Sequence, residues 1–337
     1  FSLSMKVLRI LAFPISIIYA FVVHIRNFLF DIGIFKSKEF KTPTICVGNL
    51  SAGGTGKTPM IEYLIKTMNS SHEIAVLSRG YGRKSVGYQS SKSDLSVEQL
   101  GDEPFQIHTK FPNILVTVDS NRQNGISIIE ETSKVDVILL DDAFQHRKVK
   151  PTFSILLTSY GSLYANDWYL PTGNLRDAKR EAKRADVLIV TKCPEDLSAI
   201  EKQNIIGDLK PTKNQKVLFS YLYYQKVLQG TNDTISISDL KNKKVTLVTG
   251  IANPKPLLEF LSREGLSFQH MNFRDHHFFS DHEIANINSK EFVLTTEKDF
   301  VRLKGKVNNL HYVSIEHQFL NNGAEILEKE ISGVFKQ

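Results

Sequence analysis

The chain has 337 residues, enough for two domains, and its 41% hydrophobic and 23% charged residues exclude a disordered or fibrous protein. A net charge of +6 allows three kinds of anionic partner, namely nucleic acid, lipid headgroups or a phosphorylated substrate. The two cysteines, Cys46 and Cys193, lie in or at the end of apolar runs. This placement argues against a disulfide framework or a zinc site and indicates a chain that faces the cytosol.

The first predicted element is an apolar helix within residues 1–35. Residues 10–23 carry no charge, but a bilayer span needs about 20 residues, and no small-x-small cleavage site follows as in a signal peptide. The polar or small residues of this segment form one narrow stripe at helical spacing: Ser16, Ala20, His24, Asn27 and Asp31. Such a helix can lie in a membrane interface with its wide apolar face in the lipid, or dock on the protein's own core.

Apolar runs of strand length then alternate with helical patterns. Several runs are continuously apolar, as expected of parallel strands that are buried on both faces. The predicted strands are Thr44–Val47, Ile74–Ser78, Ile114–Val118, Val137–Asp141, Phe153–Leu157 and Val187–Thr191. This alternation predicts an α/β domain with a doubly wound, mostly parallel sheet of the P-loop NTPase type over residues 36–215.

A second α/β pattern begins after a further strand at Lys216–Tyr224. Its predicted elements are strand Val245–Thr249, a helix near Pro256–Arg263, strand Ser267–Met271 and strand Phe292–Thr295. A strand at Leu310–Ile315 can pair with Lys216–Tyr224 and return the chain to the first domain. We therefore expect a smaller α/β domain over 226–309, a two-stranded hinge linker of 216–225 and 310–316, and a C-terminal helix within 317–337.

The segment Gly48–Thr58 (GNLSAGGTGKT) is rich in glycine between a predicted strand and a predicted helix. The strict P-loop pattern is G-x-x-x-x-G-K-[ST], and Ser51 stands here at its first glycine position. Glycines let backbone N–H groups turn toward phosphate oxygens, and the helix that follows adds its positive end. Lys57 would reach the β- and γ-phosphates, and the Thr58 hydroxyl would bind Mg²⁺. The alternative is a glycine-rich turn without a ligand.

Two acidic residues stand at the end of the predicted strand Val137–Asp141. A P-loop requires such residues to hold the water shell of its metal. Val137–Asp141 is continued by Asp142, so that two carboxylates stand at the strand's end. Gln145 and His146 follow closely and place further polar groups at the carboxyl edge, where doubly wound sheets bind ligands. A hydrophobic strand that ends in Asp is common, so this pattern indicates a metal site only because a P-loop precedes it in the same chain.

Asp102 and Glu103 form an adjacent carboxylate pair between a glycine and a proline. Phosphoryl transfer to an alcohol needs a base for the attacking hydroxyl, and either residue could be that base or a metal partner. A simple helix cap is the alternative.

Basic residues gather in two further places. Arg79 and Arg83 flank Gly-Tyr-Gly directly after a predicted strand, which suits phosphate or sugar contacts or a surface turn. A second cluster has mostly helical spacing and fits a solvated face, anionic headgroups or a substrate phosphate: Arg176, Lys179, Arg180, Lys183 and Arg184. In the second domain, Arg274–His282 is the densest polar cluster. It indicates either a metal site or a single functional histidine, and we favour the latter.

Together these motifs resemble the tetraacyldisaccharide 4′-kinases of lipid A synthesis over most of the chain. Serine or threonine at position 51 is typical of that family. The segments that carry the resemblance are Val47–Pro59, Ser78–Arg83, Gly101–Pro104, Leu140–Arg147, Leu170–Arg176, Gly250–Pro254, Asp275-His276 and Thr296–Asp299. The resemblance implies an ATP- and Mg²⁺-dependent kinase on the cytoplasmic face of the inner membrane, peripheral or monotopic. It would phosphorylate the 4′-hydroxyl of a lipid A disaccharide 1-phosphate.

The resemblance also implies residue roles. Asp102 matches the general base, His276 a histidine that tunes or orients it, and Lys57 a catalytic cation. The expected nucleotide contacts are Asn49, Ser51, Gly53, Gly54, Thr55, Gly56, Lys57, Thr58 and Gln145. The expected metal contacts are Thr58, Asp141, Asp142 and Glu103. The expected substrate contacts are Arg79, Tyr81, Arg122, His146 and Arg176.

Two rival functions fit parts of the sequence. A membrane-associated ATPase switch of the partitioning or positioning type would carry lysine before the two glycines of its P-loop, where this chain has Ala52. A nucleic-acid-binding protein would account for the basic charge, but the basic residues lack interleaved aromatics or a recognisable module. We therefore expect membrane-surface lipids and the lipid substrate as partners, with no nucleic acid and no obligate protein partner.

Overall fold

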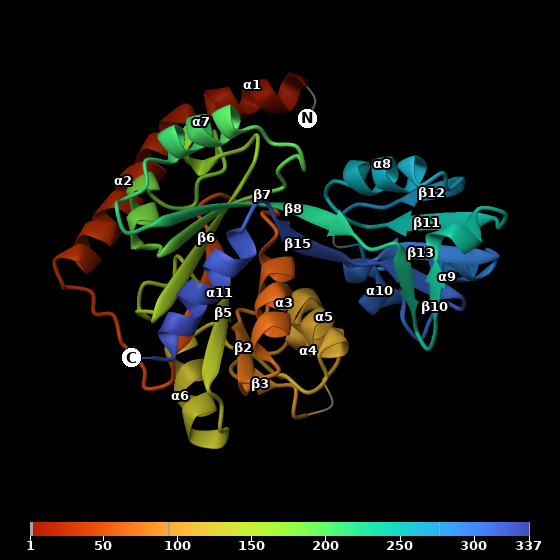
Figure 1. Cartoon of the computed structure of the whole chain (residues 1–337), viewed down its shortest axis with the longest axis horizontal. Helices are drawn as coiled ribbons and strands as arrows, with labels where there is room; N and C mark the ends of the chain where they lie inside the picture. Colours follow the sequence, from red (N-terminus) through yellow and green to blue (C-terminus); the bar gives the residue numbers. More distant parts are fainter. Residues whose placement is uncertain (1–2, 94, 276, 337) are drawn as a thin grey trace.

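A nine-stranded sheet forms the larger of two lobes in this computed structural model, which describes residues 3–93, 95–275 and 277–336 (Figure 1). In spatial order its strands are β15 (Ile315–Phe319), β8 (Lys216–Tyr224), β7 (Val187–Thr191), β6 (Phe153–Ser159), β1 (Thr44–Asn49), β5 (Val137–Asp141), β2 (Ile74–Ser78), β4 (Leu115–Val118) and β3 (Gln89–Ser90). The edge strands β15 and β3 run antiparallel to their neighbours and all other pairs are parallel. The predicted doubly wound, mostly parallel sheet is thus confirmed.

Helices cover both faces of this sheet because successive strand residues point to opposite sides. In β1, Ile45 and Val47 belong to one apolar cluster and Cys46 to the other. The first cluster is covered by α3 (Lys57–Met68), α5 (Asp102–Lys110) and α11 (Gly323–Val334), and the second by α6 (Arg122–Thr132) and α7 (Ala199–Leu209). Shorter helical segments are α4 (Val97–Leu100), η1 (Tyr164–Asn166) and η2 (Lys179–Arg184).

The smaller lobe is built on a six-stranded sheet at the right of Figure 1. In spatial order its strands are β10 (Thr234–Ser236), β9 (Val227–Gly230), β14 (Leu310–Val313), β13 (Phe292–Thr296), β11 (Val245–Thr249) and β12 (Phe268–Asn272). Its helices are η3 (Ile237–Leu240), α8 (Lys255–Arg263), α9 (Asp281–Asn288) and α10 (Glu297–Leu303).

The strand expected at Leu310–Ile315 is in fact two strands that belong to different sheets. β14 pairs with β13 and β9, and its residues Leu310 and Val313 are buried in the cores of the smaller lobe. A strand has only two edges, so β14 cannot also pair with β8. After Ser314 the chain enters the larger sheet, where β15 pairs with β8 and Ile315 lies opposite Tyr224. The pairing of 310–313 with 216–224 was therefore wrong, and β15 takes that place.

The N-terminal segment forms α1 (Leu3–Leu11) and α2 (Phe13–Asp31), which run along the outside of the larger lobe (Figure 1). The predicted polar stripe faces the protein. Its contacts are Ser16 with Thr172 (2.8 Å), His24 with Tyr169 (2.9 Å), Asn27 with Asp177 (2.6 Å), and Asp31 with Arg147 (2.7 Å) and Arg180 (3.2 Å). Asn27 and Asp177 are both fully buried, so α2 is fixed by polar contacts as specific as those of a core.

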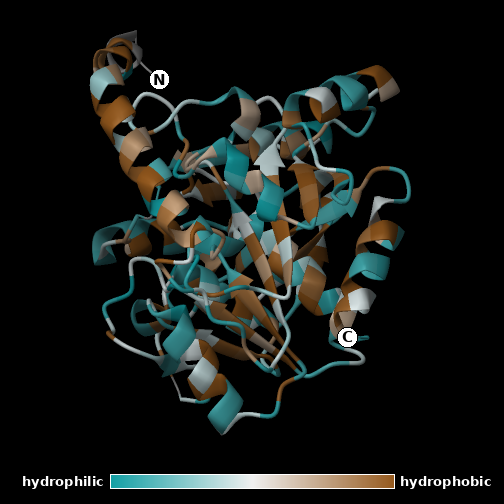
Figure 2. Ribbon diagram, turned by 90° about the vertical axis from the view of Figure 1, so that its left-hand side faces the viewer, coloured by the Kyte–Doolittle hydropathy of each residue, from teal (hydrophilic) through white to brown (hydrophobic). Residues whose placement is uncertain are grey.

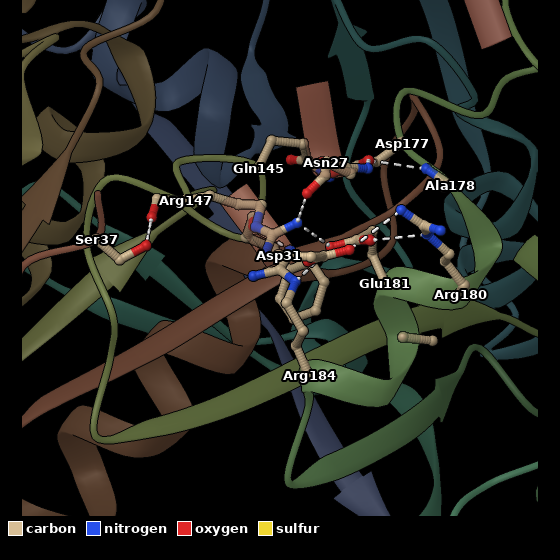
Figure 3. A network of polar contacts seen from close by, with 12 residues as sticks. Asn27, Asp31, Ser37, Gln145, Arg147, Asp177, Ala178, Arg180, Glu181 and Arg184 are labelled. Carbon is tan, nitrogen blue, oxygen red and sulfur yellow. Dashed lines mark hydrogen bonds and ion pairs between the residues drawn. The ribbon is translucent and has the colours of Figure 1, made fainter. Parts of the chain in front are cut away.

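Figure 3 shows how the basic cluster of the sequence takes part in this docking. Arg180 and Arg184 both contact Glu181, at 3.5 and 2.8 Å, and Arg147 joins Glu181 to Asp31 of α2. These arginines of the cluster therefore hold carboxylates within the protein instead of forming a fully solvated face.

The opposite face of α1 and α2 carries exposed apolar side chains. Much of both helices is brown, the colour of hydrophobic residues, in Figure 2. The exposed apolar side chains are Val7, Leu8, Ile10, Leu11, Phe13, Ile15, Ile17, Ile18, Phe21, Val22, Ile25 and Phe28. By length and composition, α2 is the one helix among the described residues that could cross a membrane. A continuous apolar patch of this kind marks an interaction surface.

Candidate phosphoryl-transfer site

The P-loop joins the end of β1 at Asn49 to the start of α3 at Lys57, at the carboxyl edge of the sheet. Gly53 and Gly56 have φ of +114° and +86°, conformations that favour glycine and let the chain wrap a phosphate. Ser51 forms a bridge with Leu175, and therefore the loop is anchored at its start. The segment has the strand, turn and helix that the motif requires.

Asn49 braces the loop from beneath. It is fully buried, and its side-chain amide donates to Thr55 Oγ1 at 3.0 Å, while its Oδ1 accepts from Arg176. Gln145, an expected nucleotide contact, donates from Nε2 to the backbone carbonyl of Asn49 at 2.6 Å. Both amide side chains thus fix the backbone that would hold the phosphates.

Lys57 and Arg176 both contact Asp142. The Lys57 Nζ lies 3.7 Å from Asp142 Oδ1, and Arg176 donates to both carboxylate oxygens at 2.8 and 3.1 Å. Burial raises the pKa of Asp142, but the Arg176 hydrogen bonds and the Lys57 charge outweigh it and lower that pKa below its usual value. Arg176, expected at the substrate, thus lies within hydrogen-bond distance of Asp142 in this structure.

Asp141 lies beneath this pair at the end of β5 and is buried. The Ser78 hydroxyl donates to its Oδ2 at 3.2 Å, whereas its buried Oδ1 has no hydrogen-bond partner within the described part of the chain. Burial and the nearby charges of Glu103 and Asp142 raise the pKa of Asp141 to about 7. A buried carboxylate oxygen of this kind, near the charges of Glu103 and Asp142, fits a divalent cation.

The described residues contain no protein-only cage of three or more His, Cys, Asp or Glu side chains.

Asp102 begins α5 directly after Gly101, whose φ of +92° turns the chain into the helix. Its carboxylate is held from the smaller lobe: Arg302 of α10 donates from Nε to Oδ1 at 3.0 Å, and from Nη2 to Oδ2. His276, the histidine expected near this base, lies outside the described residues. Glu103 lines a cavity together with Lys57 and Thr58.

The remaining expected substrate contacts lie around the same edge. Arg122 is buried at the start of α6 and donates to the carbonyl of Asp119 at 3.2 Å, whereas Arg79 and Tyr81 are exposed. Burial and the charges of Arg122, Lys148, Arg26 and Arg79 lower the pKa of His146 to about 4. His146 is therefore neutral at physiological pH, within a cationic environment suited to an anionic substrate.

Two neighbouring cavities that share lining residues adjoin the smaller lobe, and the first also adjoins the P-loop. The first has a volume of about 280 Å³ and is lined by residues 54–59 of the loop, by Glu103 and by residues 296–298 at the start of α10. The second, of about 890 Å³, shares Lys192, Leu222 and Tyr224 with the first and extends along β8. Space for a nucleotide therefore adjoins both lobes.

A family model described as tetraacyldisaccharide-1-P 4′-kinase matches residues 8–332. The chain belongs to this family. It is 48% identical over 324 residues to the tetraacyldisaccharide 4′-kinase of Flavobacterium johnsoniae, covering 94% of this chain and 95% of that one. Identity to the enzyme of the same name from Bacteroides thetaiotaomicron is 45%, over 86% and 82% of the two chains.

The fold agrees with a solved member of the family. The crystal structure of apo-form LpxK from Aquifex aeolicus in complex with ATP superposes with a TM-score of 0.81 and 29% identity, covering 97% of this chain and 99% of that one. The predicted resemblance to the tetraacyldisaccharide 4′-kinases is thus confirmed, and the ATPase-switch alternative is not favoured.

In this family member, two residues outside the expected site residues contact backbone carbonyls of the P-loop. Lys192 follows β7 and donates from Nζ to the carbonyl of Gly54 at 2.5 Å. His317 of β15 lies with Nε2 2.9 Å from the carbonyl of Gly56 and Nδ1 3.0 Å from the Ser220 hydroxyl. A carbonyl only accepts, so the neutral ring donates from Nε2 and accepts from Ser220 at Nδ1. Neither residue stands in a recognisable local motif.

We expect His317 to make folding sensitive to acid. Burial, opposed by the Gly56 hydrogen bond and assisted by Lys192, lowers the pKa of His317 to about 4. The unfolded chain binds the proton more tightly, so stability present above pH 6.5 is lost as the pH falls toward 4, by about 3 kcal/mol. Urea unfolding at both pH values should show a smaller loss in His317→Gln, whose amide can still donate to Gly56. An equal loss in both proteins would contradict this role.

Proposed function

We propose that this chain transfers the γ-phosphate of ATP to the 4′-hydroxyl of a tetraacyldisaccharide 1-phosphate, a step of lipid A synthesis. Membership of the family supports this activity, since its relatives carry that name and one is solved with ATP. The carrying observation is the grouping of Lys57, Asp141 and Asp142 at one carboxyl edge, with Asp102 at the lobe boundary.

The nucleotide and metal would be held by the P-loop and its acidic partners. The backbone N–H groups of Gly53–Thr58 would bind the phosphates, and Lys57 would neutralise charge that develops on the transferred group. Asp141 and the Thr58 hydroxyl would hold Mg²⁺, with Asp142 and Glu103 beside them. When bound, the cation would neutralise negative charge on the phosphates. Lys57 would exchange its contact with Asp142 for the phosphates.

Asp102 would act as the general base. It accepts the proton of the 4′-hydroxyl while the oxygen attacks the γ-phosphorus and the bond to the bridging oxygen breaks, so that ADP leaves. His276 would tune or orient this carboxylate. The expected acceptor contacts are Arg79, Tyr81, Arg122, His146 and Arg176. The two lobes would close about the linker formed by β8 and β15.

The acceptor would be taken from a membrane. We assign the exposed apolar face of α1 and α2 to the interface of the inner membrane, on its cytoplasmic side, because the polar stripe is already bound to the protein. This gives a peripheral or monotopic enzyme whose partners are its lipid substrate and the surrounding lipids. Neither nucleic acid nor an obligate protein partner is part of the proposal.

The activity is tested with γ-labelled ATP, Mg²⁺ and a tetraacyldisaccharide 1-phosphate in mixed micelles. We expect label in the lipid, with Lys57→Met reducing the rate by about 10²–10³-fold because one transition-state cation is lost. ATP hydrolysis without labelled lipid would instead favour the ATPase-switch alternative. Folded protein without either reaction would refute the proposal.

A further inference from the structure

Helix α5 lies between the lobes and carries Asp102 at its first residue and Lys110 at its last. It is bound to the P-loop helix α3 through Glu62, which accepts from Gln106 at 2.9 Å and from Lys110 at 2.5 Å. Glu62 is almost fully buried, so this contact joins the two helices of the larger lobe firmly.

Helix α10 of the smaller lobe contacts α5 at both ends. Arg302, near the end of α10, binds the Asp102 carboxylate, and Glu297, at its start, accepts from Lys110 at 2.5 Å. The start of α5 thus meets the end of α10, and the end of α5 meets the start of α10, so the two helices run antiparallel. All four side chains are largely buried: Arg302 is 5% exposed, Asp102 14%, Glu297 6% and Lys110 18%. Ion pairs held this far from water are position-specific, and breaking one leaves an uncompensated charge.

Arg302 is itself built into the smaller lobe. Its Nη1 donates to the carbonyl of His277 at 3.2 Å and lies 4.0 Å from Asp299 Oδ1. Asp299 in turn accepts from the backbone N–H of Gly250 at 2.8 Å. The guanidinium therefore has a fixed place in the smaller lobe, and whatever it binds takes its position from that lobe.

We infer that α10 is a two-point clamp that sets the position of the catalytic base, with Arg302 and Glu297 as its positioning residues. The inference rests on Asp102 being the base of the proposed reaction. A planar guanidinium that binds both carboxylate oxygens fixes the plane of the carboxyl group. Clamping at Lys110 fixes the other end of α5, so the base can be productive only when the lobes are correctly apposed.

Steady-state kinetics of the full chain test this clamp. We expect Arg302→Met to lower kcat about 10–100-fold with the KM for ATP nearly unchanged, since a misplacement of about 1 Å can cost that much. Arg302→Lys keeps the positive charge but cannot bind both carboxylate oxygens in one plane. Its kcat should lie between those of the wild type and Arg302→Met. Glu297→Gln should lower kcat in the same sense, while Lys150→Met, at an exposed ion pair with Glu39, should not. An unchanged kcat in Arg302→Met would overturn the inference.

A double-mutant cycle separates positioning from a merely structural role. In an Asp102→Asn background, Arg302→Met should change kcat by less than twofold, because its effect passes through Asp102. Equal losses in both backgrounds would show that Arg302 acts elsewhere and would overturn the assignment.

Hydrogen exchange tests the clamp without any kinase assay. Arg302→Met and Glu297→Gln should each speed amide exchange in Asp102–Lys110 at least tenfold, and leave that of α3 unchanged. If exchange in α5 is unaltered, the clamp is refuted. If the wild-type chain phosphorylates no lipid but exchange responds as expected, the proposed function fails and the clamp stands.

Discussion

Asp102→Asn should lower kcat by about 10²–10⁴-fold, the usual contribution of a general base. The substitution keeps the shape of the side chain and an oxygen that can accept from Arg302, but the amide cannot take the hydroxyl proton. The Asp102 carboxylate is bound by Arg302 of the smaller lobe, so the Kd for ATP should change only a few-fold. Single-turnover phosphorylation of the lipid, with ATP binding measured separately by calorimetry, provides the two values.

Glu103→Gln is the matched control for this experiment, since it changes the neighbouring carboxylate in the same way. Glu103 acts on Asp141 electrostatically and lines the loop cavity, so its loss should alter the Mg²⁺ dependence more than the proton-transfer step. Wild-type turnover in Asp102→Asn would reject the base assignment. A melting temperature far below that of the wild type would instead assign Asp102 a structural role.

Replacing Ile17, Ile18 and Phe21 together by Glu should abolish binding to anionic phospholipid vesicles. These side chains lie on one face of α2 and are 56%, 65% and 66% exposed. Full burial of each such side chain contributes about 1.5–3 kcal/mol, so their joint loss amounts to about three orders of magnitude or more in partitioning. Vesicle co-sedimentation measures the effect.

The variant should remain folded because the polar stripe that docks α2 is untouched. Val227→Glu, at an exposed apolar residue of the smaller lobe, is the control and should bind vesicles as the wild type does. With substrate presented in detergent micelles at saturating concentration, the triple variant should retain most of its kcat. Undiminished vesicle binding by the triple variant would show that this face is not the membrane contact.

Local patterns predicted most of the fold. Strands such as Val137–Asp141 and Val187–Thr191 were predicted with their exact ends because buried parallel strands are continuous apolar runs bounded by polar residues. The P-loop could also be predicted from the sequence, since its glycines and Lys57 act together within one short, continuous segment. The polar stripe of α2 was also visible in the sequence. The sequence did not show that this stripe faces the protein, because its partners Thr172 and Asp177 come from a loop some 150 residues away.

Contacts between distant segments could not be predicted from the sequence. Asp102 and Arg302 are separated by 200 residues, and His317 and Gly56 by 261, so no spacing rule relates them. Such pairs arise from topology, since β15 returns the chain beside the P-loop and α10 packs on α5. The division of Leu310–Ile315 between two sheets was missed for a similar reason. An apolar run shows that a strand exists but not which neighbours it has.

The docking of α2 has a consequence for where the reaction occurs. The Tyr19 hydroxyl donates to the backbone carbonyl of Arg176 at 3.0 Å, and the side chain of Arg176 binds Asp142. With α2 in the interface, the reacting phosphate would therefore stand at a constant height above the acyl chains. The acceptor need not be extracted: its sugar headgroup would be phosphorylated where it emerges from the bilayer, and the enzyme would select hydroxyls by their depth as well as by their chemistry.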